Sequence, residues 1–325
     1  MTSQNPYRLP RHILPKHYAI ELEPDLAAGS FDGQVVIDLE VVTETDTIVL
    51  NAVELEIEEV RVEQSDSVSA SSILMDEDLE RAEFSLPIVL QPGPARLFCS
   101  FKGILNDKLR GFYRSTWNDD AGNEHVIATT QFESTNARRA FPCFDEPDLK
   151  ASFGVTLRVD DSLMTVSCGE LVSSTQLENG RREDQFADTM IMSTYLVAFI
   201  VGELEATDPI DVDGVPLRIV HVPGKGDLTE FGLLAGEFGL RWLVDYYDIP
   251  YPAGKLDLIA VPDFAFGAME NLGCVTFRET LLLSDPDRTT QAELTRIVDV
   301  IAHEIAHMWF GNLVTMDWWN GIWLK

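Results

Sequence analysis

Basic residues, paired cysteines and long apolar runs are all scarce in this sequence of 325 residues. Lysine and arginine together number 24 against 54 aspartates and glutamates, which gives a net charge of −30. A protein that binds nucleic acid needs a basic surface to meet the phosphates, so this balance argues against a nucleic-acid partner. We interpret the acidity mainly as a solvated, highly soluble surface, with adaptation to a salt-rich source as the alternative.

The four cysteines are scattered along the chain, and no two of them form a CxxC pair. They are Cys99, Cys143, Cys168 and Cys274. A disulfide framework or a second metal site would need a different spacing, so we expect reduced and mostly buried thiols.

No apolar run reaches the roughly 18–20 residues that a membrane-spanning helix needs. Residues 1–18 also lack the apolar core of a signal peptide. Together with the unpaired cysteines, these absences predict a cytoplasmic protein with no evident contact to a membrane.

The strongest chemical signal that is present is the HExxH pentad, which runs from His303 through Glu304 to His307. Residues four apart on a helix share a face, so the two histidines can direct their imidazoles at one metal ion. Zinc accepts such nitrogen ligands, and a catalytic zinc site keeps one position open for water. Glu304 can then act as the general base that takes a proton from that water.

The pentad lies in a stretch that is typical of a long amphipathic helix from Thr289 to Phe310. Thr290 followed by Glu293 matches a capping box, and Gly311 is typical of a helix end. The apolar positions with spacings of three and four are Leu294, Ile297, Val298, Ile301, Ile305 and Trp309. The alternative is a chance pentad on a core helix, with histidines that are merely packed.

A second motif, Gly267-Ala268-Met269-Glu270-Asn271, precedes the pentad. GAMEN followed by HExxH resembles the paired signature of the zinc aminopeptidases of the aminopeptidase N type, whose catalytic domain is similar to thermolysin. Residues 111–115, 131–133, 140–147, 193–199 and 309–316 are also similar to segments of that family. The resemblance runs from about Pro15 to the last residue.

The resemblance implies an enzyme with one Zn²⁺ that removes N-terminal amino acids from peptides with a free N-terminus. It assigns the metal to His303 and His307, and the substrate's α-amino group to Glu270 with help from Glu133. That amino group is largely cationic at pH 7, because its pKa is about 7.7–8.0, so carboxylates can hold it. Without the family, Glu133 would be interpreted as a solvated loop carboxylate.

The rest of the GAMEN motif is assigned to substrate binding as well. Gly267 and Ala268 would present backbone groups to a substrate lying as an added strand. Met269 would line the first specificity pocket, with core packing as the alternative, and Asn271 completes the motif.

Two histidines do not complete a catalytic zinc site, which has three protein ligands. The resemblance implies a third ligand, a glutamate separated from His307 by eighteen residues, and Met308–Lys325 are eighteen residues. The ligand would follow Lys325, so the sequence lacks it, and it also lacks the family's transition-state tyrosine. Residues 318–323 are expected to begin the helix that carries that ligand. We therefore expect a fragment that binds zinc weakly or not at all and hydrolyses nothing by itself.

The hydrophobic patterns predict a multidomain chain with two parts. Residues 1–205 repeatedly alternate in twos, as in residues 35–41 and 153–159, and are expected to form an all-β domain that is similar to the family's saddle-like N-terminal domain. Residues 206–325 are expected to form the first half of an α+β thermolysin-like domain, truncated, with GAMEN on the strand that edges the cleft. Its expected elements are strands at 216–222, 255–261 and 275–283 and a helix at 231–247, followed by the pentad helix.

Two other functions stay open at this point. A leukotriene-hydrolase-like enzyme would share the fold and the metal, although GAMEN rather than a GGMEN-like variant argues against it. A catalytically silent scaffold or binding module would have no physical need for intact His303, Glu304, His307 and Glu270.

Overall fold

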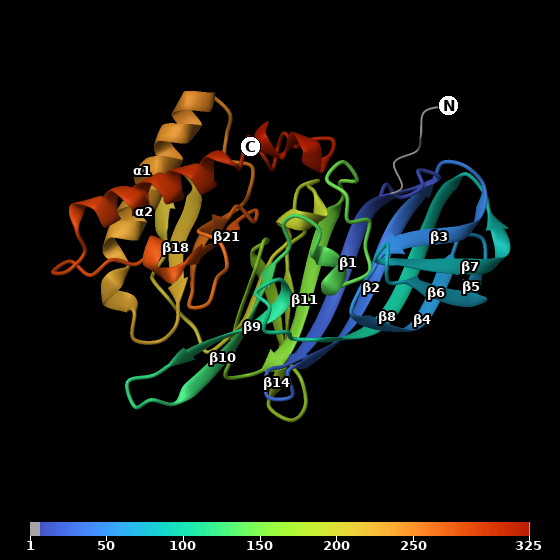
Figure 1. Cartoon of the computed structure of the whole chain (residues 1–325), viewed down its shortest axis with the longest axis horizontal. Coiled ribbons are helices and arrows are strands. Elements are labelled where there is room, and N and C mark those ends of the chain that lie inside the picture. Colours follow the sequence, from blue (N-terminus) through green and yellow to red (C-terminus); the bar gives the residue numbers. More distant parts are fainter. Residues whose placement is uncertain (1–6, 325) are drawn as a thin grey trace.

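The structure is a computed structural model that describes residues 7–324. Residues 1–6 and 325 belong to the two expected domains but lie outside the described residues. Figure 1 shows a broad β-sheet part, coloured blue to green, beside a smaller part that carries the two α-helices, coloured gold to red.

The largest sheet has eight strands in the order β13-β14-β11-β1-β2-β8-β4-β5. Strand β2 shows why it forms, because every second residue from Phe31 to Val41 is buried and those between them are not. The pairs in this sheet are antiparallel, except for β1 beside β11. The strands are β1 (Ile13–Asp25), β2 (Ser30–Val41), β4 (Leu55–Glu63), β5 (Ser67–Ser69), β8 (Gly93–Ile104), β11 (Ser152–Asp160), β13 (Leu171–Gln176) and β14 (Arg181–Phe186).

Two smaller sheets complete the β domain. One contains β3 (Thr45–Asn51), β6 (Ser72–Asp76) and β7 (Arg81–Leu90). The other contains β9 (Gly111–Asn118), β10 (Glu124–Gln131), β12 (Met164–Ser167) and β15 (Phe199–Gly202). The described residues up to Gly202 contain only two short 3-10 helices, η1 (Ala137–Arg139) and η2 (Thr194–Leu196), and no α-helix. The all-β prediction for this part is confirmed.

The chain then passes to a six-stranded sheet, which it enters with the strand that begins at Glu205. Its central strands β18, β19 and β21 are parallel, and every residue of β19 is buried, as expected for a strand covered on both faces. The strands are β16 (Glu205–Ala206), β17 (Ile210–Val212), β18 (Val215–His221), β19 (Leu256–Val261), β20 (Ala268–Met269) and β21 (Cys274–Arg278). The helices are η3 (Gly226–Leu228), α1 (Glu230–Tyr247), η4 (Glu279–Leu281), α2 (Gln291–Ala306) and η5 (Trp319–Leu324).

Three predicted elements differ from the structure. The strand expected at 275–283 ends at Arg278, where a 3-10 turn takes over. The helix expected to reach Phe310 ends at Ala306, because the following residues fold into turns around Gly311, whose φ is +136°. Residues 318–323 lie mostly in the 3-10 helix η5 rather than at the start of an α-helix.

The four cysteines are free and buried, as predicted. Burial raises the pKa of the Cys168 thiol to about 11, so it stays protonated at neutral pH. Among residues 7–324, no helix combines the length and the apolar character needed to cross a bilayer.

Candidate active site

Helix α2 begins where the capping box places it. The Thr290 hydroxyl accepts a hydrogen bond from the Glu293 backbone N–H, and the Thr290 N–H donates to the Glu293 carboxylate at 2.8 Å. The hydrogen bonds from the Thr290 backbone and hydroxyl lower the pKa of Glu293. The capping box thus fixes the residue at which α2 begins.

The two pentad histidines converge at the other end of α2. Their Nε2 atoms lie 2.9 Å apart, with the ring planes at 84°. The Nδ1 atom of His307 lies 2.9 Å from the backbone carbonyl of Phe310, so this nitrogen can carry the proton and leave Nε2 for a metal. His303 is exposed, whereas His307 is buried.

This pair fits a zinc ion closely. Two imidazole nitrogens on one tetrahedral zinc, with bonds of about 2.0–2.1 Å, lie about 3.3 Å apart. The rings of His303 and His307 therefore need to separate by only a few tenths of an ångström from their present spacing of 2.9 Å. The donor set is also the one that zinc prefers.

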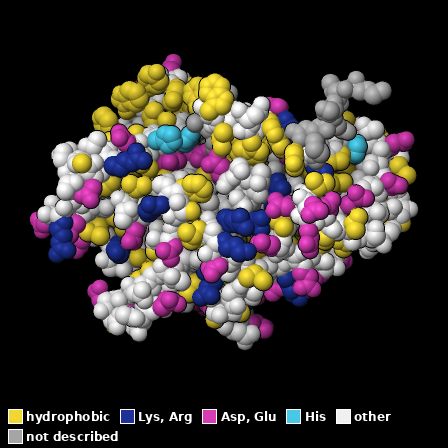
Figure 2. Space-filling view, viewed as in Figure 1, with side chains coloured by type: hydrophobic (Ala, Val, Ile, Leu, Met, Phe, Trp, Pro, Cys, Tyr) yellow, Lys and Arg dark blue, Asp and Glu magenta, His cyan; other side chains and the backbone are white. Residues whose placement is uncertain are grey.

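Two buried carboxylates lie beside the histidines. Potential ligand atoms of Glu270, Glu304 and His307 all lie within 4.8 Å of one another. Glu304 comes from α2, and Glu270 directly follows β20, which pairs with β21 at the edge of the six-stranded sheet. Figure 2 shows histidine side chains with acidic side chains beside them over this end of α2. The two sequence motifs thus meet at one point, with GAMEN at the sheet edge as predicted.

A cavity of about 450 Å³ opens next to the pentad. Its lining residues are Gly267, Ala268, Arg296, Asp299, Val300, His303 and Glu304. Arg296 and Asp299 were not predicted to lie here, although they precede His303 by seven and four residues and therefore share its helical face. The cavity wall thus carries charged side chains of both signs beside His303.

The other predicted site residues lie around this cavity rather than in its lining. Met269 is buried, and the amide nitrogen of Gln131 lies 3.5 Å from its sulfur. Asn271 is also buried, and its side chain donates to the backbone carbonyls of Leu196 and Val197 at 3.3 and 3.4 Å. The structure thus gives Met269 and Asn271 packing and anchoring contacts.

Glu133 is partly buried and lies two residues beyond Gln131, whose side chain touches Met269. The segment that carries Glu133 therefore runs beside the GAMEN motif. Glu133 is not a member of the Glu270, Glu304 and His307 cluster.

Comparison with known proteins agrees with these two motifs. The peptidase M1 N-terminal domain matches residues 14–196, and the peptidase family M1 domain matches residues 235–325. The chain belongs to peptidase family M1. This confirms the resemblance to the aminopeptidase N type and the order of an all-β domain followed by the start of the M1 peptidase domain.

Curated M1 relatives resemble the chain over nearly all of its length. It is 45% identical over 321 residues to puromycin-sensitive aminopeptidase of Caenorhabditis elegans, which covers 98% of this chain and 34% of that protein. It is 41% identical to aminopeptidase M1 of Arabidopsis thaliana, covering 98% of this chain and 36% of the relative. It is 38% identical to human endoplasmic reticulum aminopeptidase 1, covering 99% and 35%. The chain spans about a third of the length of the curated relatives it matches.

The names of these M1 relatives bear on activity and on compartment. All three are named aminopeptidases, which supports a peptidase. One name refers to the endoplasmic reticulum, and a yeast relative with 41% identity is named as mitochondrial. M1 membership therefore does not fix the compartment, and the cytoplasmic location stays a prediction.

Proposed function

We propose that this M1 protein is a zinc-dependent aminopeptidase that removes N-terminal amino acids from peptides. The observation that carries the proposal has two parts: the Nε2 atoms of His303 and His307 lie 2.9 Å apart, and ligand atoms of His307, Glu304 and Glu270 all lie within 4.8 Å of one another. Such a set brings together candidate metal ligands, a candidate base and a candidate cation-binding group.

In this proposal His303 and His307 hold a zinc ion, which would supply Lewis acidity and lower the pKa of water to about 7. Glu304 takes the proton of the attacking water and returns it to the departing amine, as a general base and then a general acid. Glu304 is largely buried, so its charge is less screened by bulk water and acts more strongly on a group beside it.

The substrate's α-ammonium group is assigned to Glu270, with Glu133 as a second carboxylate. Glu270 is 3% exposed, so a cation that reaches it is largely desolvated and is attracted strongly. Gly267 and Ala268 line the cavity beside the pentad. A substrate backbone can approach them closely, because glycine has no side chain and that of alanine is small. An amine-binding group beside the metal would limit cleavage to the first peptide bond.

A rival role for Glu270 follows from the same geometry. Its carboxylate lies within 4.8 Å of the ligand atoms of His307 and Glu304, which is close enough to complete a metal site.

If Glu270 binds the substrate instead, the two imidazoles leave a catalytic zinc site one protein ligand short. We therefore propose that the 325 residues alone bind zinc weakly and hydrolyse peptides poorly, and that the full activity belongs to a protein of the relatives' length.

The test measures zinc stoichiometry and the hydrolysis of aminoacyl-arylamides. Both are compared between this chain and a form extended to the length of the relatives, with Glu304→Gln as the inactive control in each. We expect one zinc per molecule and turnover only in the extended form. Full activity of the 325-residue chain would contradict the proposal that these residues alone hydrolyse peptides poorly. An extended form that hydrolyses nothing would contradict the aminopeptidase proposal itself.

A further inference from the structure

The turn that follows α2 holds the second pentad histidine at two points. The Phe310 carbonyl lies 2.9 Å from Nδ1 of His307, and the Asn312 backbone N–H donates to the His307 carbonyl at 3.0 Å. Gly311 lies between these two contacts, and a Cβ atom added there would meet His307 Nδ1 at 3.2 Å. The orientation of the His307 ring therefore depends on the path of residues 310–312.

The same turn also holds the GAMEN motif. The side-chain amide of Asn312 donates to the backbone carbonyl of Glu270 at 2.8 Å, and Asn312 is completely buried. A displacement of Asn312 would thus move both His307 and Glu270, although these residues lie on different elements.

Two side chains from the preceding β domain donate hydrogen bonds to this turn. The buried Tyr195 hydroxyl, in η2, donates to the Gly311 carbonyl at 3.2 Å. The Lys150 ammonium group, which precedes β11, donates to the carbonyls of Asn312 and Leu313, each at 3.2 Å. Hydrogen bonds from a charged donor are roughly twice as strong as those between neutral groups.

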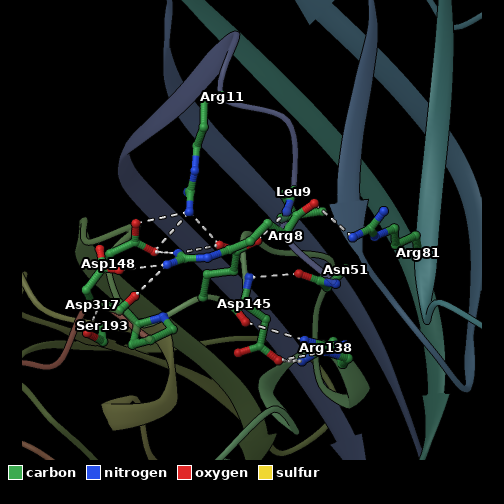
Figure 3. A network of polar contacts seen from close by, with 12 residues as sticks. Arg8, Leu9, Arg11, Asn51, Arg81, Arg138, Asp145, Asp148, Ser193 and Asp317 are labelled. Carbon is green, nitrogen blue, oxygen red and sulfur yellow. Dashed lines mark hydrogen bonds and ion pairs between the residues drawn. The ribbon is translucent and has the colours of Figure 1, made fainter. Parts of the chain in front are cut away.

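Two more contacts join the residues that follow this turn to the β domain and to Arg8. The Tyr195 ring packs edge-on against Trp319, with the ring centroids 5.2 Å apart. Figure 3 shows Arg8 between Asp148 and Asp317, and its guanidinium nitrogens lie 2.8 Å from an oxygen of each carboxylate. Residues 311–319 are thus fixed by side chains from far earlier in the chain.

We infer that Tyr195 and Lys150 are positioning residues for His307 and Glu270, acting through the turn Gly311–Leu313. The inference rests on the proposed function, because it takes His307 as a metal ligand. Partners that orient a metal-binding histidine typically change metal affinity by about 10- to 100-fold when they are removed. The β domain would then help to orient the metal-binding and amine-binding groups of the proposed site.

The test uses Tyr195→Phe alone and together with Lys150→Met in the form extended to the length of the relatives, because that form is the one expected to hold the metal. Tyr195→Phe retains the ring against Trp319, and the Thr315 hydroxyl still donates to the Gly311 carbonyl at 2.6 Å, so the fold should survive. Co²⁺ is titrated as the probe, because its visible absorption reports both affinity and coordination geometry. We expect Tyr195→Phe to weaken Co²⁺ binding about tenfold, the double variant to weaken it further, and the spectrum to change.

Tyr113→Phe is the matched control. Tyr113 is also a buried tyrosine of the β domain. Its hydroxyl donates at 2.9 Å to the backbone carbonyl of Asp263, which lies in the part of the chain that carries the α-helices. The control should bind Co²⁺ within about twofold of the wild type and give the same spectrum, with a thermal midpoint similar to that of Tyr195→Phe. A general loosening between the two parts would instead affect both variants equally.

A second measurement needs no metal. Hydrogen exchange of the Asn312 N–H reports the bond to the His307 carbonyl, and we expect it to be at least about fivefold faster in both test variants but not in the control. If the extended wild type binds no Co²⁺, the proposed function fails, and the exchange rates alone decide whether the β domain positions the turn. Unchanged exchange would overturn the inference. So would faster exchange with unchanged Co²⁺ affinity and spectrum, because the contacts would then be only structural.

Discussion

The side-chain amide of Asn312 donates a 2.8 Å hydrogen bond to the backbone carbonyl of Glu270. This bond joins the turn after the HExxH helix to the GAMEN motif at the sheet edge, so the expected metal ligands and the expected amine-binding carboxylate share one buried support.

Replacement of Glu304 should separate metal binding from catalysis. Glu304→Gln keeps the size of the side chain but removes the base, so turnover in the extended form should fall by about 10²- to 10⁴-fold while zinc stoichiometry is retained. His303→Ala is the contrasting variant, because it removes a ligand and should lose the zinc. Metal analysis and arylamide hydrolysis measure the two properties, and loss of zinc from Glu304→Gln would identify Glu304 as a ligand instead of the base.

Replacement of Glu270 should distinguish its two possible roles. If Glu270 binds the α-ammonium group, Glu270→Gln in the extended form should retain zinc and raise KM for substrates with a free N-terminus. Loss of a charge-assisted contact of about 1.5–3 kcal/mol corresponds to a fall in kcat/KM of roughly 10- to 150-fold. Steady-state kinetics with parallel zinc analysis provides the measurement. Loss of the metal would instead support Glu270 as the third ligand.

Replacement of Gly311 should disturb the metal site through backbone geometry. Gly311 has φ +136°, and an added Cβ would lie 3.2 Å from the ring and from the carbonyl oxygen of His307. In the extended form, Gly311→Ala should therefore lower the free energy of unfolding by about 1–3 kcal/mol and also weaken zinc binding. Calorimetry and metal titration measure the two effects.

Gly122→Ala is the control for that variant. Gly122 also has a positive φ, of +85°, but an added Cβ there would meet no atom within 4 Å. It should lose some stability for the same backbone reason and bind zinc like the wild type. Equal zinc binding by both variants would show that the approach to His307 is not important.

Asp257 should support the stability of the second part at neutral pH. Its buried carboxylate accepts two hydrogen bonds from Arg218, at 2.8 and 3.0 Å, and one from Lys255 at 2.8 Å. Burial by itself would raise the pKa of Asp257, but Lys255 and Arg218 outweigh it and the pKa is lowered. Asp257→Asn leaves two cations without their carboxylate and should cost about 3–5 kcal/mol of unfolding free energy at pH 7.

The pH dependence of that loss has a definite sign. Because the pKa of Asp257 is lower in the folded state, its stabilisation is complete above the unfolded pKa of about 3.9 and is lost as the pH falls through the folded value. The difference between wild type and Asp257→Asn should therefore shrink below about pH 4. Urea unfolding at several pH values measures this. Asp38→Asn, which breaks an exposed pair with Arg96, should cost at most about 1 kcal/mol, and an equal cost for both variants would contradict the prediction.

Local patterns in the sequence were sufficient for much of the fold. Alternation predicted the strand at 35–41, and the capping box of Thr290 and Glu293 predicted the start of α2 within two residues. These features depend on neighbours within a few positions, so they can be read without knowledge of the fold. The end of α2 was predicted four residues too late, because the turn after Ala306 is held by contacts from the distant β domain.

The sequence by itself determined the chemistry of the candidate site: the HExxH spacing places His303 and His307 on one helical face, and that spacing requires nothing beyond the helix period. Only the tertiary structure decided which other groups join them. Glu270 is brought to His307 by the pairing of β20 with β21, and Met269 and Asn271 turn into the core. Tyr195 and Lys150 reach the turn after His307 from more than a hundred residues away in the chain. No local pattern encodes such contacts, because they depend on how segments far apart in the chain pack against each other.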